Sequence, residues 1–321
     1  MSRLRSFLQR RLADEPHDTD TETRPDAAAL AEELAANPQT ITLEDGRQLG
    51  YAECGDPDGV PLVVYHGFPN SRVFGALFDE VGRERGIRVI TPDRPGMGVS
   101  DPDPDRTLLD WPGDVRQLLD ALDIDETPVV GISGGGPYAA TTAARLGDRV
   151  THVGIVCGLG PMAAVGLGER LWYYTARFTP SVSKLALLLL VQRARGDPAA
   201  WLESLAENAH PSDEALWRGE VGQVLHASAV EAQRHHGLDP LVQETALYGR
   251  PWPFDLEEIE VPVTLWYGKA DTLVPVEMGL YLAREIPTAE AHIYPELDHL
   301  SIVTENETDI VETVVGTETT R

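Results

Sequence analysis

A serine flanked by glycines stands where a predicted strand gives way to a predicted helix. The stretch from Pro128 to Gly136 reads PVVGISGGG, and the motif G-x-S-x-G within it is centred on Ser133. Val129 and Val130 indicate the end of a buried strand, and the small residues after the motif favour a helix packed closely on a sheet. In this context the motif indicates a nucleophile. The alternative is a glycine-rich turn that carries a solvated serine.

Both glycines of the motif, Gly131 and Gly135, have a steric reason to be there. A sharp strand-to-helix turn would bring side chains at these two positions into collision. The first turn of the following helix also supplies unpaired N–H groups and a positive dipole end beside the serine oxygen. These features favour Ser133 as the nucleophile of an acyl-transfer reaction.

A serine hydroxyl at neutral pH needs a base to take its proton, and the base needs an acid that fixes its tautomer. Asp271 and His299 fall in loops that follow separate predicted strands, and the chain order Ser133, Asp271, His299 is that of an α/β-hydrolase triad. Taken alone, Asp271 would fit a turn or helix N-cap, and His299 would fit an ordinary loop. Their joint placement and order favour a catalytic acid and base.

Acyl transfer also requires two backbone N–H donors where negative charge develops on the substrate oxygen. The N–H of Gly134, directly after the nucleophile, is one candidate. The second is the N–H of Phe68 in the sequence HGFP, which follows an apolar strand. We interpret His66 as a structural loop residue. Asp93 and Arg94 are expected to brace a loop and to have no catalytic role.

A parallel sheet is needed to bring these distant residues together. Apolar runs predict strands at residues 60–65, 87–91, 150–157, 263–267 and 291–294, besides the strand that carries Ser133. The dipeptide Asp45-Gly46 predicts a hairpin ahead of them. Because helical stretches separate most of the strands, we expect an α/β fold with a mostly parallel, doubly wound sheet.

Between residues 160 and 255 this alternation stops, and the sequence predicts several helices with concentrated aromatic residues. We expect this insertion to form a helical lid over the site. The predicted segments are therefore a mobile N-terminal tail (1–38), the first part of the core (39–159), the lid (160–255) and the second part of the core (256–321). Within the tail, Asp26 to Ala36 could form a helix, and a basic amphipathic stretch near the start could touch a membrane. A frayed terminus is the simpler interpretation.

The charge balance excludes some partners. The 321 residues include 52 acidic and 26 basic side chains, and the net charge of −26 rules against nucleic acid or an anionic membrane as the main partner. Only Lys184 and Lys269 are lysines. An acidic surface that nearly excludes lysine suits a protein of a halophilic organism, where concentrated salt screens the self-repulsion. An ordinary acidic protein is the alternative.

The remaining composition points to a cytoplasmic protein. Cys54 and Cys157 allow at most one disulfide, and the longest apolar run, Leu185 to Val191, is too short to span a bilayer. No signal-peptide pattern opens the sequence, so we expect no stable membrane insertion. The expected partner is a small-molecule substrate, and the sequence leaves the oligomeric state open.

Several stretches together resemble the α/β-hydrolase superfamily, in the branch that includes prolyl aminopeptidases, esterases and C–C hydrolases. They are HGFP, DRPGMGVS, GISGGGPYA, GKADTLVP and DHL, and the similarity extends from residue 40 to the end. The resemblance implies Ser133 as nucleophile, Asp271 as acid and His299 as base. Two positions depart from the family pattern: Asp298 replaces a usual glycine and could alter the pKa of His299, and Gly134 stands where many relatives have a larger residue.

We therefore expect a serine hydrolase that cleaves a carboxylic ester of a small or medium molecule through an acyl-enzyme, an activity of class EC 3.1.1. On the same triad, an aminopeptidase-like or C–C bond hydrolase is the alternative. A non-catalytic receptor for a small ligand is an alternative of another class, although such receptors typically lose a triad member. The histidines at 226, 235 and 236 lack the spacing of a metal site. No metal and no cofactor are expected.

Overall fold

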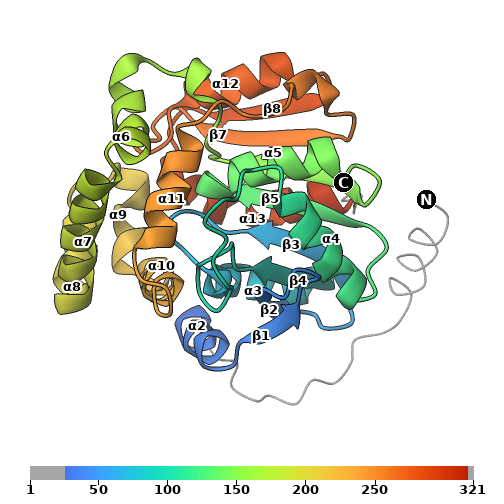
Figure 1. Cartoon of the computed structure of the whole chain (residues 1–321), viewed down its shortest axis with the longest axis horizontal. Helices are drawn as coiled ribbons and strands as arrows, with labels where there is room; N and C mark the ends of the chain where they lie inside the picture. The colour runs from blue at the N-terminus through green and yellow to red at the C-terminus, as the bar shows by residue number, and fades with distance from the viewer. Residues whose placement is uncertain (1–25, 317–321) are drawn as a thin grey trace.

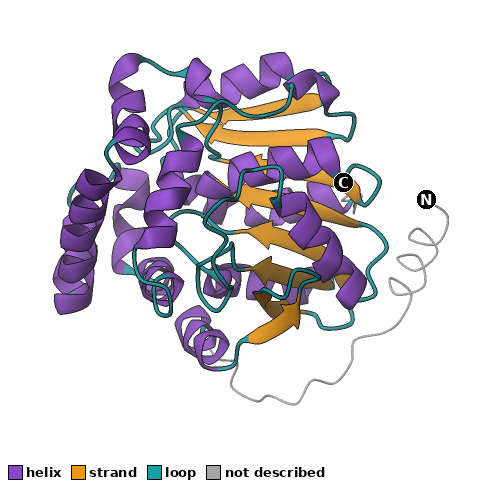
Figure 2. Cartoon of the chain, viewed as in Figure 1, coloured by secondary structure: helices purple, strands orange, loops and turns teal. Residues whose placement is uncertain are grey.

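The computed structural model describes residues 26–316 and contains an eight-stranded sheet with helices on both faces (Figure 2). The strand order is β1-β2-β4-β3-β5-β6-β7-β8. The strands are β1 (Gln39–Thr42), β2 (Gln48–Gly55), β3 (Val60–Tyr65), β4 (Ile87–Pro92), β5 (Thr127–Ile132), β6 (Val150–Val156), β7 (Val263–Gly268) and β8 (Ala289–Tyr294). The pairs β1–β2 and β2–β4 are antiparallel, and all the other pairs are parallel. The predicted fold class is confirmed.

Two layers of helices explain why the central strands are continuous apolar runs. One face of the sheet packs against α4 (Trp111–Ala121), α5 (Gly136–Arg145) and α12 (Val276–Glu285), and the other against α3 (Asp79–Arg85) and α13 (His299–Val315). Every residue of β5 and β7 is buried. A strand covered on both faces cannot alternate between apolar and polar residues.

The predicted N-terminal tail ends earlier than residue 38. Residues 1–25 lie outside the described part of the chain, but α2 (Ala27–Ala36) is a helix whose first turn is capped by the carboxylate of Asp26. Its residues Leu30 and Ala31 are buried with apolar side chains of η1 (Arg72–Phe78) and α10 (Glu220–Ala232). This apolar stripe gives the helix a packing partner, so the expectation of a mobile tail is wrong for residues 27–36.

Only helices are described between β6 and β7, and they lie beyond the carboxyl ends of the parallel strands (Figure 1). They are η3 (Met162–Ala164), α6 (Leu167–Phe178), α7 (Pro180–Gly196), α8 (Pro198–Ala206), α9 (Pro211–Arg218), α10, α11 (Asp239–Tyr248) and η4 (Leu256–Glu258). Residues 213–236 have helical spacing throughout, but the helix is divided at Gly219 into α9 and α10. A Cβ atom at Gly222 would lie 2.1 Å from the carbonyl oxygen of Trp217, so the chain folds back closely there.

No helix within residues 26–316 has both the length and the apolar character needed to cross a bilayer.

Candidate active site

Ser133 directly follows β5 in a strained turn and is the first residue of the short helix η2 (Ser133–Gly135). Its φ angle is +53°, in a region that non-glycine residues adopt rarely and mainly at functional sites. A Cβ atom at Gly131 would lie 2.6 Å from the carbonyl oxygen of Gly135, and a Cβ at Gly135 would lie 2.3 Å from that of Tyr65. Both glycines are therefore sterically required, and the turn holds Ser133 at the end of the strand.

His299 and Asp271 meet although 28 positions separate them. Asp271 lies in the loop after β7, and His299 is the first residue of α13. The distance between His299 Nδ1 and Asp271 Oδ2 is 2.9 Å, and the side chain of Asp271 is fully buried. The other carboxylate oxygen of Asp271 accepts the backbone N–H groups of Leu273 and Val274, both at 2.8 Å. This arrangement fixes the orientation of the imidazole and leaves Nε2 available as a base.

The surroundings of His299 set its protonation. Burial favours the neutral ring, but Cys157 and Asp271 favour the charged one, and the pKa of His299 lies well above its usual value. Burial raises the pKa of the Cys157 thiol, whose Sγ lies 3.9 Å from His299 Nε2. Because that thiol stays protonated at neutral pH, the carboxylate of Asp271 is the charge that raises the pKa of His299.

The loop that carries Phe68 lies directly against the serine turn. A Cβ atom at Gly67 would lie 3.3 Å from Ser133 Cβ, and one at Gly134 would lie 3.1 Å from the backbone nitrogen of Phe68. Arg94 holds this loop in place by donating to the carbonyl oxygens of His66 at 2.6 Å and of Gly67 at 3.0 Å. The backbone N–H groups of Phe68 and Gly134 thus belong to adjacent segments beside Ser133.

A tyrosine of the helical segment explains the glycine at position 134. The hydroxyl of Tyr248, on α11, lies 3.0 Å from the carbonyl oxygen of Gly134 and 2.7 Å from Glu244 Oε1. A Cβ atom at Gly134 would come within 2.5 Å of that hydroxyl. A larger side chain has no room at position 134, because Tyr248 already occupies the space.

Behind this contact lies a buried cluster of charged and phenolic groups. Glu244 Oε1 lies 2.6 Å from Arg94 Nε, and Glu244 Oε2 lies 2.6 Å from both Arg106 Nη2 and the Tyr138 hydroxyl. Burial opposes ionisation of Glu244, but Arg94 and Arg106 outweigh it and lower its pKa. The expected pairing of Asp93 with Arg94 is wrong, since Asp93 pairs with Arg72 at 2.8 Å. A carboxylate of the helical segment between β6 and β7 therefore holds the arginine that supports the Phe68 loop.

A second contact joins the helical segment to the turn that carries His299. The carboxylate of Asp213, on α9, accepts the backbone N–H groups of Leu300 at 2.6 Å and Ser301 at 2.8 Å. Asp298 accepts the N–H groups of Thr272 at 2.8 Å and His210 at 3.1 Å. Asp298 thus ties three segments together. Asp298 is not among the main influences on the pKa of His299, which burial lowers and Cys157 and Asp271 raise.

Ser133 and His299 line the same cavity, whose volume is about 390 Å³. Its walls are mainly apolar and come from both the core and the helical segment. They include Phe68, Phe74, Leu190, Trp201, Trp217 and Leu225. Among the described residues, no arginine or lysine lines this cavity. The site can hold an uncharged apolar group beside the serine.

The described side chains offer one compact set of metal-ligand atoms. Ligand atoms of Cys157, Asp271 and His299 lie within 4.8 Å of one another. However, Asp271 already binds His299, and the thiol of Cys157 is buried and protonated. His226 donates from Nε2 to the carbonyl oxygen of Ala194, at 3.0 Å. We therefore assign a metal neither to the set of Cys157, Asp271 and His299 nor to His226.

Four residues of this site escape sequence reasoning: Cys157, Asp213, Glu244 and Tyr248. Each acts through a partner more than 80 positions away in the chain, such as Tyr248 with Gly134 at a separation of 114. A local motif cannot reveal such a pair.

The fold and the geometry of the site define a class of enzyme. The family model described as the alpha/beta hydrolase fold matches residues 60–306. The chain therefore belongs to the α/β-hydrolase family.

Individual known proteins are also similar to this chain. The chain is 28% identical over 262 residues to the dihydrolipoyllysine-residue acetyltransferase component of an acetoin cleaving system from Pseudomonas putida; the match covers 79% of this chain but only 62% of that protein. It is also 28% identical to a 2-hydroxy-6-oxo-6-phenylhexa-2,4-dienoate hydrolase from Burkholderia cepacia, over 74% of this chain and 80% of that one. A solved hydrolase from Pseudomonas aeruginosa PA01 matches with a TM-score of 0.67 at 21% identity, covering 88% of this chain and 99% of that one.

Proposed function

We propose that this protein is a serine hydrolase that cleaves a carboxylic ester with an uncharged, apolar acyl group. The observation that carries the proposal is the 2.9 Å hydrogen bond between His299 Nδ1 and Asp271, beside a cavity that Ser133 and His299 both line. A serine in a strained turn, a base and a buried acid are the parts that acyl transfer requires.

In the proposed reaction, Ser133 Oγ attacks the ester carbonyl while His299 Nε2 takes the hydroxyl proton. Asp271 stabilises the imidazolium that forms. The N–H groups of Phe68 and Gly134 donate to the oxyanion, and its collapse breaks the ester C–O bond as His299 returns the proton to the departing alcohol. Water, deprotonated by His299, then attacks the acyl-enzyme. The acid leaves and Ser133 regains its proton.

The charges around the cavity argue for a neutral substrate. A substrate carboxylate would find no arginine or lysine among the described lining residues. A substrate amine would find Asp213 and Asp298, but both carboxylates already accept backbone N–H groups. These facts favour an uncharged ester over an amino-terminal peptide.

A second candidate comes from the relatives. The matched protein from Burkholderia cepacia is named a 2-hydroxy-6-oxo-6-phenylhexa-2,4-dienoate hydrolase, and further relatives at 24–27% identity are named hydrolases of 2-hydroxymuconate semialdehyde or of other 2-hydroxy-6-oxo acids. Such compounds contain no ester or amide, so their hydrolysis breaks a carbon–carbon bond. The same serine, base and acid could perform that reaction. The lack of an arginine or lysine among the described lining residues weighs against it, since such a substrate carries a carboxylate.

The helical segment at 160–255 is proposed as a lid that selects the acyl group. Leu190, Trp201, Leu205 and Trp217 of this segment line the cavity. Apolar walls of this kind discriminate by about 1–3 kcal/mol per methylene. The segment would also support the oxyanion donors, because α11 holds Arg94 and contacts Gly134.

Labelling by a fluorophosphonate tests the nucleophile. Wild-type protein should be labelled once and Ser133→Ala should not, whereas Ser181→Ala, at an exposed position of α7, should be labelled like wild type. Equal labelling of Ser133→Ala would reject the assignment.

A substrate panel then tests the reaction. It contains p-nitrophenyl esters from acetate to octanoate, an ester with a terminal carboxylate, proline p-nitroanilide and a 2-hydroxy-6-oxodienoate. Neutral esters should have the highest kcat/KM. Faster turnover of the dienoate than of the esters would establish a C–C hydrolase. Faster turnover of the anilide than of the esters would establish an aminopeptidase.

A further inference from the structure

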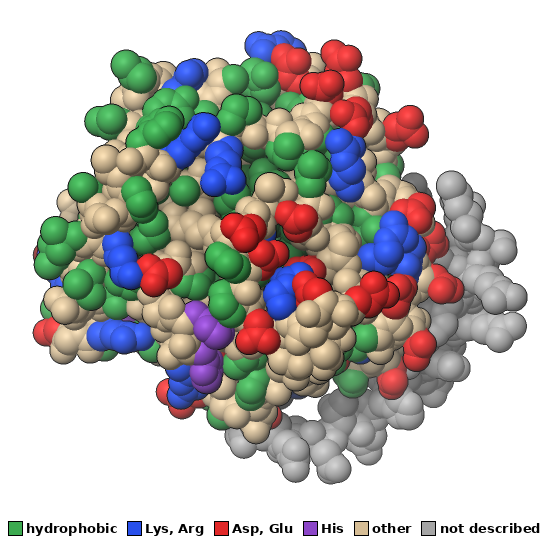
Figure 3. Space-filling view, viewed as in Figure 1, with side chains coloured by type: hydrophobic (Ala, Val, Ile, Leu, Met, Phe, Trp, Pro, Cys, Tyr) green, Lys and Arg blue, Asp and Glu red, His purple; other side chains and the backbone are tan. Residues whose placement is uncertain are grey.

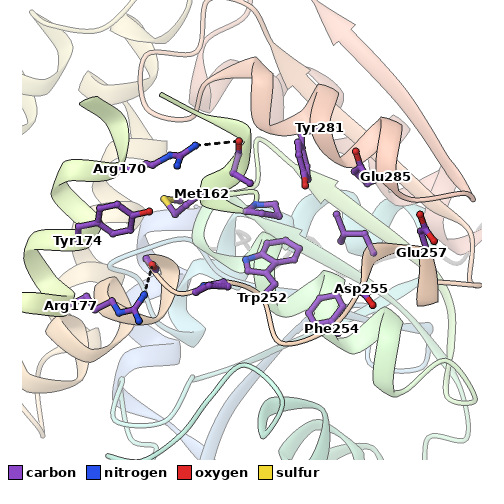
Figure 4. A pocket seen from close by; sticks show the side chains of 15 residues that line it. Met162, Arg170, Tyr174, Arg177, Trp252, Phe254, Asp255, Glu257, Tyr281 and Glu285 are labelled. Carbon is purple, nitrogen blue, oxygen red and sulfur yellow. Dashed lines mark hydrogen bonds between the residues drawn. The ribbon is translucent and has the colours of Figure 1, made fainter. Parts of the chain in front are cut away.

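A second cavity lies away from the catalytic residues, between the helical segment and the core. Its volume is about 650 Å³, larger than the catalytic cavity and within the usual range of small-molecule sites. It is bounded by η3, α6, the chain after α11, η4 and α12 (Figure 4). Ser133, Asp271 and His299 do not line it.

One wall of this cavity carries two arginines that have no acidic partner within the described part of the chain. Arg170, Tyr174 and Arg177 lie on one face of α6, because their spacing of four and three residues follows the helical repeat. In Figure 4 their side chains extend from α6 towards Trp252. Among the described residues, neither arginine forms an ion pair, although acids outnumber bases 52 to 26 in the sequence.

The hydrogen bonds of these arginines leave most of their donors free. Arg170 donates to the carbonyl oxygens of Val165 at 2.8 Å and Ala163 at 3.4 Å. Arg177 donates to that of Gly249 at 3.5 Å. A guanidinium has five N–H donors and binds carboxylates well. The α6 wall therefore presents positive charge to the cavity.

A third N–H donor of this cavity belongs to the indole of Trp252. Trp252 lines the cavity, and its indole N–H is buried without a hydrogen-bond partner among the described residues. A buried donor left unpaired costs about 1–3 kcal/mol. The indole also stacks on Phe254, with the ring centres 5.6 Å apart. The cavity thus combines unpaired N–H donors with a flat aromatic surface.

The acids of this cavity lie on the opposite side from α6 (Figure 4). Asp255 accepts the N–H of Glu258 in a capping box, and Glu285 pairs with Arg284 at 2.6 Å. Glu257 is exposed. These carboxylates do not compensate the α6 arginines, and they would repel a second negative group at the far end of a ligand.

We propose that this cavity binds an aromatic monocarboxylate, with its carboxylate at Arg170, Arg177 and the Trp252 N–H and its ring against Trp252 and Tyr174. The proposal does not depend on the reaction at Ser133. Because the whole protein has a charge of −26, long-range attraction cannot account for binding an anion, and the local donors must do so.

Calorimetric titration with 2-naphthoate tests the proposal. Wild-type protein should bind one molecule. The double variant Arg170→Gln/Arg177→Gln should weaken the Kd at least tenfold, and Trp252→Phe about fivefold, the effect of one hydrogen bond. Arg250→Gln is the matched control, since Arg250 follows the lining residue Gly249 but does not line the cavity. Its Kd should stay within about twofold of wild type.

Ligand variants separate charge from shape. The neutral 2-naphthamide and the dianionic naphthalene-2,6-dicarboxylate should each bind at least tenfold more weakly than 2-naphthoate. Equal binding of the amide, or unchanged binding by the double-arginine variant at an unchanged Tm, would overturn the proposal.

Protein blocked by the fluorophosphonate shows which cavity is occupied. Binding of 2-naphthoate should survive the block, and loss of binding would place the ligand in the catalytic cavity instead. If the fluorophosphonate does not react, the proposed reaction fails, but the arginine and tryptophan variants still decide this inference.

Discussion

A serine hydroxyl can lose its proton only to a neutral imidazole, so the pKa of His299 governs the pH range of the proposed reaction. That pKa is raised, because the negative charge of Asp271, 2.9 Å away, outweighs the effect of burial. As the pH falls through the pKa of His299, the ring becomes charged and can no longer act as the base. Activity should therefore be lost on the acidic side.

Asp271→Asn tests this coupling. Wild-type kcat/KM should rise with pH around a midpoint above about 6.5, the ordinary histidine value. The variant should lose on the order of 10⁴ in kcat, because the amide favours the wrong tautomer, and its midpoint should fall. Asp148→Asn, at an exposed residue paired with Arg116, is the control. An unchanged midpoint in Asp271→Asn would point to another source of the shift.

Gly134→Ala tests the contact with Tyr248. The new methyl group would meet the Tyr248 hydroxyl at 2.5 Å, so this variant should lose about 1–3 kcal/mol of stability, measured by urea unfolding. Tyr248→Phe removes the hydroxyl, and in that background Gly134→Ala should lose less than half as much. Equal losses in the two backgrounds would show that the hydroxyl is not the obstacle.

Sequence reasoning works best where the chemistry lies in one short stretch. The turn around Ser133 could be predicted because its glycines, strand and helix are contiguous, and Asp271 and His299 could be predicted from their order after strands. Glu244 could not, since its partners Arg94 and Arg106 lie about 140–150 positions away and no local pattern joins them.

At the scale of elements, the helical segment is attached to the core by two sets of contacts. At one point Glu244 of α11 pairs with Arg94 and Tyr248 of α11 contacts the serine turn, and at another Asp213 of α9 caps α13. These buried contacts restrain the segment at two points. Its apolar side chains can then define a cavity of constant shape.

The sequence located this segment from the break in strand–helix alternation, but not its internal divisions. The stretch 213–236 has helical spacing throughout, and only the close approach at Gly222 shows why α9 ends at Arg218. The helix α2 was missed as a packed element because its apolar stripe is short, and its partners on η1 and α10 are distant in sequence. The contacts of α2 with these partners form only in the folded chain, so the local sequence does not reveal them.

The contact between α3 and α13 should make stability depend on pH. Burial and the neighbouring Glu80 and Glu84 raise the pKa of Glu307 to about 7. The folded state therefore binds this proton more tightly than the unfolded chain does. The stabilisation is complete below the unfolded pKa of about 4.5 and is lost as the pH rises through about 7.

Glu307→Gln should remove this loss. At about pH 8 the variant should be more stable than wild type by about 1 kcal/mol, less than the full pKa shift implies because the side chain is partly exposed. Near about pH 4 the two proteins should have equal unfolding free energies. Glu305→Gln, at an exposed position of the same helix, is the control. Equal gains in unfolding free energy in both variants would indicate that removal of any negative charge stabilises the protein. The contact of Glu307 with α3 would then not be the cause.

For the whole molecule, the dominant feature is its charge. The net charge of −26 comes with two lysines, Lys184 and Lys269. In the view of Figure 3, acidic side chains gather on the upper and right parts, and apolar ones over the helices at the left. The exposed large apolar side chains of α6 and α7 include Leu167, Leu171, Phe178, Leu185 and Leu189. Self-repulsion of so many carboxylates opposes the compact state.

Added salt should therefore stabilise the protein. The Debye length falls from about 30 Å in dilute buffer to about 3 Å in molar salt, which screens repulsion between surface carboxylates. Thermal melts from dilute buffer to molar potassium chloride should show a steep rise in Tm. Sucrose at equal osmolality is the control, because it strengthens burial without screening charge. A Tm that stays flat in salt, or rises equally in sucrose, would contradict adaptation to a salt-rich interior and leave an ordinary acidic enzyme.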